Sequence, residues 1–283
     1  LNNSGDYIII GGPANTEGLG ISTFGGHARV YHWDGNSWDQ IGQDIDSPIT
    51  LGTGTFGCSV GINNDGDRII IGGRMYTGTN SNDQERGIAM TYEYDGSAWM
   101  LMGDTIFGSN SGDNLGEAVE ISGDGNTIAI GNYGAVNADP SDNTSNVSVT
   151  NEYGNVYTFK KNLILNPLKP PSSDFMPLPY LTGPDGSFGY GYAVQLNDSG
   201  EILAVAQKNM LGGGIYDANV YIYRWNPGPA PAMGWAYVQT ISGESDMDFG
   251  HKIAMSKNGK KLFISQLNDI SSRVYIYSWQ DPL

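Results

Sequence analysis

Three acidic side chains, Glu244, Asp246 and Asp248, alternate along five residues near the C-terminal end of the 283-residue chain. Carboxylate oxygens that converge from one short loop are the ligands that Ca²⁺ takes in proteins. This segment is therefore the metal-site candidate of the sequence, and calcium is the one cofactor that we consider. The alternative is that the three acids lie in a solvated loop and bind no ion.

The three histidines, His27, His32 and His251, offer little for catalysis. None of them stands beside a Ser, Cys or Asp in a recognisable nucleophile motif, and none has metal-ligand spacing. We identify no catalytic residue and expect that the protein is not an enzyme.

Loop residues supply two further kinds of candidate site. Tyr76, Tyr133 and Tyr216 lie in variable loops, where exposed rings can stack on sugars, so a glycan is one candidate ligand. Asn143 and Asn146 are Asn-x-Ser/Thr sequons in a long polar loop, and we expect them to carry glycans if the protein is secreted by a eukaryote.

The elements that must position these residues follow a repeat. One pattern recurs five times: an apolar residue, two small polar residues, a turn that ends in Gly and a β-branched run. Its first, apolar residue stands at positions 1, 62, 121, 196 and 255. A period of this size indicates a modular array. We place the repeats at residues 1–55, 56–114, 115–187, 188–248 and 249–283 of a single region.

Each repeat is predicted to form four short antiparallel strands. In the second repeat, residues 56–62 and 68–72 flank an Asx/Gly hairpin turn, residues 87–94 form a third strand, and residues 99–103 form a fourth. The third strands carry two aromatic columns two residues apart, so both columns face one side of the sheet. These columns are Tyr31, Tyr92, Tyr157, Tyr223 and Tyr277, and Trp33, Tyr94, Phe159, Trp225 and Trp279.

Repeated four-stranded meanders with an aromatic motif in each unit are how β-propeller blades pack. The predicted fold class is therefore an all-β propeller with five visible blades. The polar residue between the two aromatic columns, His32, Glu93, Thr158, Arg224 or Ser278, is predicted to face water.

Two motifs resemble the FG-GAP repeat. Phe-Gly opens the first strand at positions 56, 188 and 249, and Gly-Gly-Pro follows the second strand at 11–13. This family forms the propeller of integrin α-subunits and of many secreted proteins, and the resemblance implies a platform for protein partners. Family members often hold Ca²⁺ in an acidic loop between strands one and two. The corresponding turns here, such as residues 63–67 and 256–259, keep too few acids for that cage.

The strand count expected from this alignment is 3 + 4 + 4 + 4 + 3, because the first repeat lacks a first strand and the last repeat lacks a fourth. Simple closure between the two ends would then fail. We expect either that flanking sequence completes a ring of six or seven blades or that these residues are the ordered part of a larger chain. If the five repeats were the whole molecule, closure through a second copy would make self-assembly the leading function.

The composition limits the class of partner that the protein can bind. Acidic residues outnumber Lys and Arg by 30 to 14, giving a net charge of −16, which argues against nucleic acid and anionic membranes. No apolar run reaches the length of a transmembrane helix. We therefore expect a non-catalytic extracellular or surface-assembly protein that binds protein partners through variable loops such as residues 132–154 and 160–186. The alternatives are a lectin-like propeller and, less favoured, a propeller hydrolase or lyase.

Overall fold

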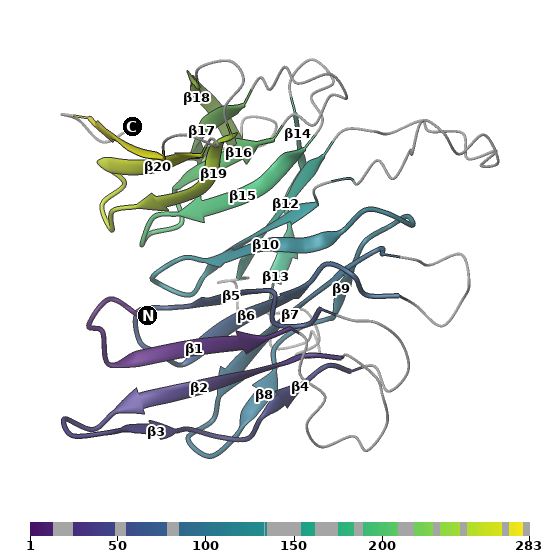
Figure 1. Cartoon of the computed structure of the whole chain (residues 1–283), viewed down its shortest axis with the longest axis vertical. Helices are drawn as coiled ribbons and strands as arrows, with labels where there is room; N and C mark the ends of the chain where they lie inside the picture. The colour runs from purple at the N-terminus through teal and green to yellow at the C-terminus, as the bar shows by residue number, and fades with distance from the viewer. Residues whose placement is uncertain are drawn as a thin grey trace.

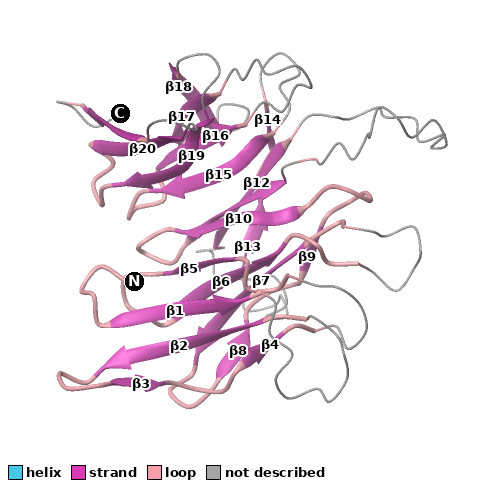
Figure 2. Cartoon of the chain, in the orientation of Figure 1, coloured by secondary structure: helices cyan, strands magenta, loops and turns pink. Residues whose placement is uncertain are grey.

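The computed structural model describes residues 1–13, 25–48, 55–77, 85–132, 134, 154–161, 175–183, 189–208, 218–228, 233–243, 248–267 and 272–279. All regular structure in these residues is β-strand, arranged as five antiparallel sheets that follow one another along the chain (Figures 1 and 2). The predicted all-β class with five propeller blades is confirmed. In the described part of the chain we find no helix suited to crossing a bilayer.

The sheets are named blades 1 to 5. Blade 1 contains β1 (Tyr7–Gly12), β2 (His27–Trp33), β3 (Trp38–Gln40) and β4 (Ile45–Asp46). Blade 2 contains β5 (Ser59–Ile62), β6 (Arg68–Gly73), β7 (Ile88–Tyr94), β8 (Trp99–Leu101) and β9 (Ile106–Phe107). Blade 3 contains β10 (Leu115–Ile121), β11 (Thr127–Asn132), β12 (Asn155–Lys161), β13 (Phe175–Pro177) and β14 (Leu181–Thr182). Blade 4 contains β15 (Tyr190–Leu196), β16 (Ile202–Gln207), β17 (Asn219–Asn226) and β18 (Gly234–Ser242). Blade 5 contains β19 (Asp248–Met255), β20 (Lys261–Leu267) and β21 (Arg273–Ser278).

The first strands, β5, β10, β15 and β19, contact one another in succession, so they form the inner row of the array. The fourth strand is broken in blades 1 to 3, where two short strands pair with the same third strand: β3 and β4 pair with β2, for example. In blade 1, β1 corresponds to the second strand β6, because both follow the hairpin turn. Blades 1 and 5 lie at opposite ends of the array (Figure 1).

An Asn or Ser side chain stabilises each hairpin turn between the first and second strand positions, and it is buried in blades 1 to 4. The Oδ1 atom of Asn63 accepts hydrogen bonds from the backbone N–H of Asp67 (3.1 Å) and Arg68 (2.9 Å). Ser122 does the same with its hydroxyl, which accepts from the N–H of Thr127 at 2.9 Å. The turn is thus held by a side-chain acceptor that replaces water at backbone donors.

Replacing Asn63 by alanine is expected to lower the free energy of unfolding by about 2 kcal/mol, because two backbone donors beside a side chain that is 1% exposed lose their acceptor. Asn63→Ser is the matched control, since blade 3 uses serine there, and it should lose less than half as much. Urea unfolding of both variants measures the difference, and equal losses would contradict this account of the turn.

Apolar cores fill the space between consecutive blades. Ile9, Ala28 and Val30 of blade 1 pack with Ile69 and Ile71 of blade 2, and the same arrangement recurs between each later pair. The aromatic residue that ends the third strand packs on a Trp across the sheet: Trp33 on Trp38, Tyr94 on Trp99 and Trp225 on Trp235, with ring centroids 5.1 to 5.6 Å apart. These rings are packing residues.

Blade 3 departs from the predicted aromatic columns. Phe159, not Tyr157, pairs with Ile128 at the position where Tyr31 pairs with Ile8 and Tyr92 pairs with Ile69. The alignment of the third repeat was therefore wrong by two residues. As a result Thr158, predicted to face water, is 1% exposed and accepts a hydrogen bond from Nε1 of Trp235 at 2.9 Å.

In blade 4 the position predicted for the Phe-Gly motif was also wrong by two residues. Tyr190 pairs with Gln207 as Phe249 pairs with Gln266 and Leu115 pairs with Asn132. Tyr190-Gly191 therefore occupies the place for which the sequence suggested residues 188–189. The Tyr190 ring is fully buried, and its hydroxyl donates to that of Tyr223 at 2.8 Å.

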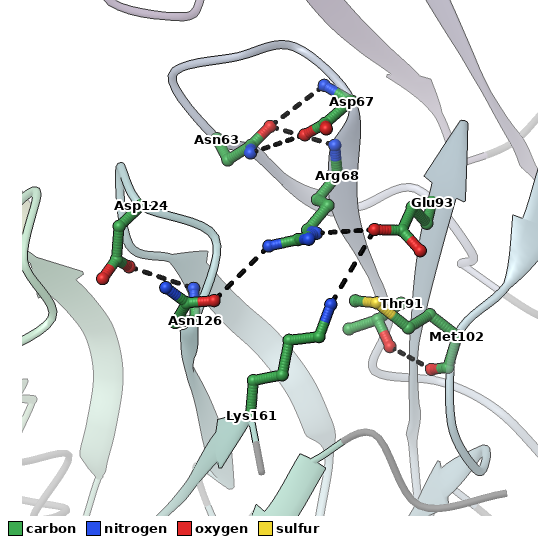
Figure 3. A network of polar contacts seen from close by, with 9 residues as sticks. All are labelled: Asn63, Asp67, Arg68, Thr91, Glu93, Met102, Asp124, Asn126 and Lys161. Carbon is green, nitrogen blue, oxygen red and sulfur yellow. Dashed lines mark hydrogen bonds and ion pairs between the residues drawn. The ribbon is translucent and has the colours of Figure 1, made fainter. Parts of the chain in front are cut away.

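Polar side chains also join blades 2 and 3 (Figure 3). The Arg68 guanidinium donates to Glu93 of its own blade at 2.9 Å and to Asn126 of blade 3 at 3.4 Å. Lys161 of blade 3, which stands where blades 1, 2, 4 and 5 have Trp or Tyr, lies 3.8 Å from the same Glu93 carboxylate. The neighbouring turns are joined by the backbone as well, since the N–H of Asn64 donates to the carbonyl of Gly123 at 2.8 Å.

Candidate functional site

Each blade presents a forward face to the next blade in the chain and a backward face to the preceding one. Two third-strand positions define the forward face: Ala28 and Val30, Ala89 and Thr91, Val156 and Thr158, Val220 and Ile222, and Val274 and Ile276. In blades 1 to 4 these side chains are at most 3% exposed, because the next blade covers them. The forward face of a blade is thus an apolar contact surface.

The forward face of blade 5 is open. Val274 and Ile276 are 65% and 62% exposed, although they occupy the positions of the fully buried Val220 and Ile222. Phe263 pairs with Ile276 and extends the surface onto β20. Tyr275 and Tyr277, on the other face of β21, pack against blade 4. Side chains suited to a core therefore lie at the surface of this blade.

The backward face of blade 1 is open in a corresponding way. Ile71, Ile130, Val205 and Ile264 are fully buried in blades 2 to 5, whereas Ile10 in the same position is 50% exposed. Ile8 and Tyr31, which pair with each other across β1 and β2, are half-buried. Apolar side chains of the kind that fill the blade interfaces are therefore exposed on β1 and β21.

A polar cluster lies between blades 4 and 5, near the start of β19. Asp248 Oδ2 lies 2.9 Å from His251 Nδ1 and 3.1 Å from the Lys208 ammonium. The Tyr192 hydroxyl is 3.5 Å from the same His251 nitrogen, and Lys208 lies 4.7 Å from the centre of the Tyr192 ring. One carboxylate oxygen is therefore shared by two basic groups of the protein.

This cluster bears on the predicted metal site. Asp248 is held by Lys208 and His251, and the other two candidate ligands, Glu244 and Asp246, lie outside the described residues. In the described part of the chain no group of three or more His, Cys, Asp or Glu side chains could hold a metal ion.

A second ionisable group lies on the inner row of strands. Glu120 of β10 accepts a hydrogen bond of 2.6 Å from the Gln195 amide of β15. Burial raises the pKa of Glu120 from 4.5 to about 8, and the hydrogen bond from Gln195 opposes that rise. Near neutral pH this carboxyl is therefore largely protonated, and the inner face of blades 3 and 4 carries less negative charge than the sequence indicates.

The other predicted site residues are distributed as follows. Tyr76 is half-buried and packs on Phe107, with ring centroids 5.3 Å apart. Tyr133, Tyr216, Asn143 and Asn146 lie outside the described residues. Two further sequon residues, Asn2 and Asn197, are at most 8% exposed, and their side chains hold hairpin turns. Of the predicted site residues only Tyr76 and Asp248 lie within the described part of the chain, and they belong to blades 2 and 5.

Sequence reasoning did not single out Val274, Ile276 or Ile10. Their alternation with Tyr275 and Tyr277, or with Ile9, is the same as in the buried blades, so the local pattern carries no signal of exposure.

No protein-family model matches the chain, and no curated protein matches it. Among solved structures, the β-propeller domain of Cps50 (Swd1) from Myceliophteria thermophila has a TM-score of 0.46 and 8% identity, over 98% of this chain and 81% of that one. Periplasmic gluconolactonase of Pseudomonas aeruginosa has a TM-score of 0.41 and 13% identity, over 98% and 79%. The tricorn protease has a TM-score of 0.46 and 11% identity over 89% of this chain, which spans 25% of that protein.

The five consecutive antiparallel sheets, with their first strands in contact one after another, give the chain a β-propeller fold. The similarity to solved structures extends to that fold alone.

Proposed function

We propose that the protein is a non-catalytic assembly protein of an extracellular, cell or particle surface, and that its propeller is a platform for other protein chains. The observation that carries the proposal is the exposure of apolar side chains on described strands, where Val274, Ile276 and Ile10 are half or more exposed. Apolar surface of this kind marks a protein–protein contact.

The polar groups support a non-catalytic role. Among the described residues, Asp248 pairs with Lys208 and His251, and Glu117 lies 3.2 Å from Arg74. The net charge of −16 favours protein over nucleic acid as the partner.

The proposal includes a relation to the FG-GAP repeat. The glycine that follows Phe56 or its counterpart Leu115 has a structural reason in this chain, since Gly57 and Gly116 lie against Gly11 and Gly72 of the preceding blade. A side chain on any of these four residues would separate two blades. This contact supports the resemblance between the repeat units.

A photo-crosslinking experiment tests the platform. Benzoylphenylalanine placed at position 276 is expected to form adducts with protein in material from the native source. The same group at Met100, a 55% exposed position on the outer strand β8, is the control. Absence of a protein adduct at position 276, or equal adducts at both positions, would count against the proposed function.

A further inference from the structure

We propose that a pocket between blades 4 and 5 binds a sugar acid, that is, a sugar unit that carries a carboxylate group. The pocket has a volume of about 240 Å³ and lies between the hairpin turns of the two blades, next to Ile202 and Arg224. Pockets for drug-sized ligands measure roughly 300 to 1,000 Å³, so this one suits a ligand of the size of one sugar ring. The inference goes beyond the proposed function and does not depend on it.

The two preceding interfaces show what the protein places at this position. In blades 2, 3 and 4 the third-strand residue that pairs with the first residue of the second strand is, respectively, Glu93, Lys160 and Arg224. Glu93 lies 3.8 Å from Lys161 of the next blade (Figure 3). The Lys160 ammonium donates to the Gly200 carbonyl of the next blade at 3.2 Å and lies 4.8 Å from the centre of the Trp225 ring. Both side chains thus have a partner in the following blade.

Arg224 has no such partner. In the described part of the chain the side chains of Arg224 and Lys257, which line the pocket from blades 4 and 5, make no hydrogen bond or ion pair. Ile202 lines the pocket at the position that Arg68 has in blade 2, and its shorter side chain leaves room beside Arg224. Two cations therefore border a hollow that the protein itself does not fill.

The two carboxylates of the pocket interact with other parts of the protein. Asp198 Oδ2 accepts hydrogen bonds from the side-chain amides of Asn3 (2.9 Å) and Asn64 (3.1 Å), which belong to blades 1 and 2. Glu201 interacts electrostatically with the Lys160 ammonium of blade 3. The two cations are therefore the charges that remain for a ligand, and they favour an anionic one.

The kind of anion follows from the charged groups. The guanidinium of Arg224 presents a planar fork of N–H donors that matches a carboxylate, and the Lys257 ammonium adds a second positive charge. Because two protein carboxylates border the same pocket, a ligand group with a single negative charge is favoured over a phosphate dianion. A carboxylate meets both conditions.

The uncharged side chains suit hydroxyl groups. Asn258 uses its Oδ1 atom within the turn, where it accepts from the Ser256 hydroxyl (2.9 Å) and the Lys260 N–H (3.0 Å), so its amide N–H groups can donate to a ligand. The Ser199 hydroxyl accepts from Asn197 at 3.1 Å and can donate its own proton. A ligand that carries hydroxyl groups beside its carboxylate, as a sugar acid does, uses all of these donors.

The walls of the pocket are held in place by the protein alone. The backbone N–H of Asp198 donates to the carbonyl of Lys257 at 3.0 Å and joins the two turns. Asn197 Oδ1 accepts from the N–H groups of Glu201 and Ile202 at 2.9 Å each. Because these bonds fix the turns before a ligand arrives, little ordering is required on binding.

Binding of galacturonate to the full chain tests the inference, measured by saturation-transfer NMR and by titration. Galactose has the same ring without the carboxylate and is expected to bind about tenfold more weakly, since it cannot form the charged contact. Arg224→Gln is expected to weaken galacturonate binding about tenfold for the same reason. Lys252→Gln is the control, because Lys252 is an exposed lysine of β19 outside the pocket, and it should bind like wild type.

Lys257→Gln removes the second cation from the other blade and is also expected to weaken binding. Galacturonate that does not bind to wild type, or that binds equally to Arg224→Gln and Lys252→Gln, would overturn the site. Acetate that displaces galacturonate at equal concentration would show a site for simple carboxylates and overturn the assignment of a sugar.

Trigalacturonate distinguishes the two sources of such a unit. A trimer that binds at least as tightly as galacturonate would assign the site to a unit of an acidic polysaccharide. A trimer that binds more weakly would assign it to the free sugar acid.

Discussion

Gly131→Ala is expected to lower the free energy of unfolding by about 3 kcal/mol, because a single methyl group would force two blades apart. A Cβ on Gly131 would lie 2.0 Å from the backbone carbonyl oxygen of Gly191 in blade 4. Gly131 pairs with Val156 in its sheet, and Gly191 lies in the irregular start of β15 with a φ of 89°, so relieving the clash would require a shift of one of these two strands. Urea unfolding followed by tryptophan fluorescence measures the loss.

Blade 4 provides the control for this substitution. Ala206 stands at the position of Gly131, and in blade 5 Gly250 lies against its Cβ, so this one interface accommodates a methyl group. Ala206→Gly is expected to cost about 1 kcal/mol through lost burial and added backbone freedom in the unfolded chain. A loss for Gly131→Ala no greater than that of Ala206→Gly would show that the blades are not in close backbone contact.

Glu120→Gln is expected to change how stability depends on pH. The folded-state pKa of Glu120 is about 8, above its ordinary value of 4.5, so between these values the folded chain holds a proton that the unfolded chain has lost. Stability from this group is complete below pH 4.5 and is lost as the pH rises to 8. The variant cannot ionise, so it should match wild type near pH 4 and be more stable by about 5 kcal/mol at pH 9.

Unfolding measured at several pH values tests this prediction. Gln195→Met is a useful second variant, because the amide that opposes the raised pKa of Glu120 is removed while the side chain keeps its length. The fall in stability should then extend to higher pH than in wild type. If the free energy of unfolding depended on pH in the same way for wild type and Glu120→Gln, the pKa of Glu120 would be the same in the folded and unfolded chain, and the prediction would be wrong.

Much of the fold could be predicted from the repeat. Gly-containing turns and β-branched runs recur because each blade needs the same hairpin and the same buried strand, and the hairpin of residues 63–67 formed as expected. Two details were wrong. Phe159 occupies the column predicted for Tyr157, and Tyr190-Gly191 occupies the place predicted for residues 188–189. Both are shifts of two residues. A shift of two keeps every side chain on its own face, so alternation cannot detect it.

The candidate site could not be predicted in the same way. Asp248 was chosen as a metal ligand on its spacing to Glu244 and Asp246, whereas in the structure it pairs with Lys208, which is distant in the sequence. Sequence spacing indicates which side chains can share a loop. It does not indicate which side chain another blade will place beside them.

The amino-acid sequence by itself determined the number of blades, their hairpin turns and the net charge of −16, because all of these are local or additive properties of residues. Only the tertiary structure decided that Val274 and Ile276 lie at the surface while Val220 and Ile222 are buried. The two pairs have similar residue types in the same strand pattern. Their exposure differs because burial of a sheet face depends on whether another sheet covers it, and that covering is a property of the assembled array.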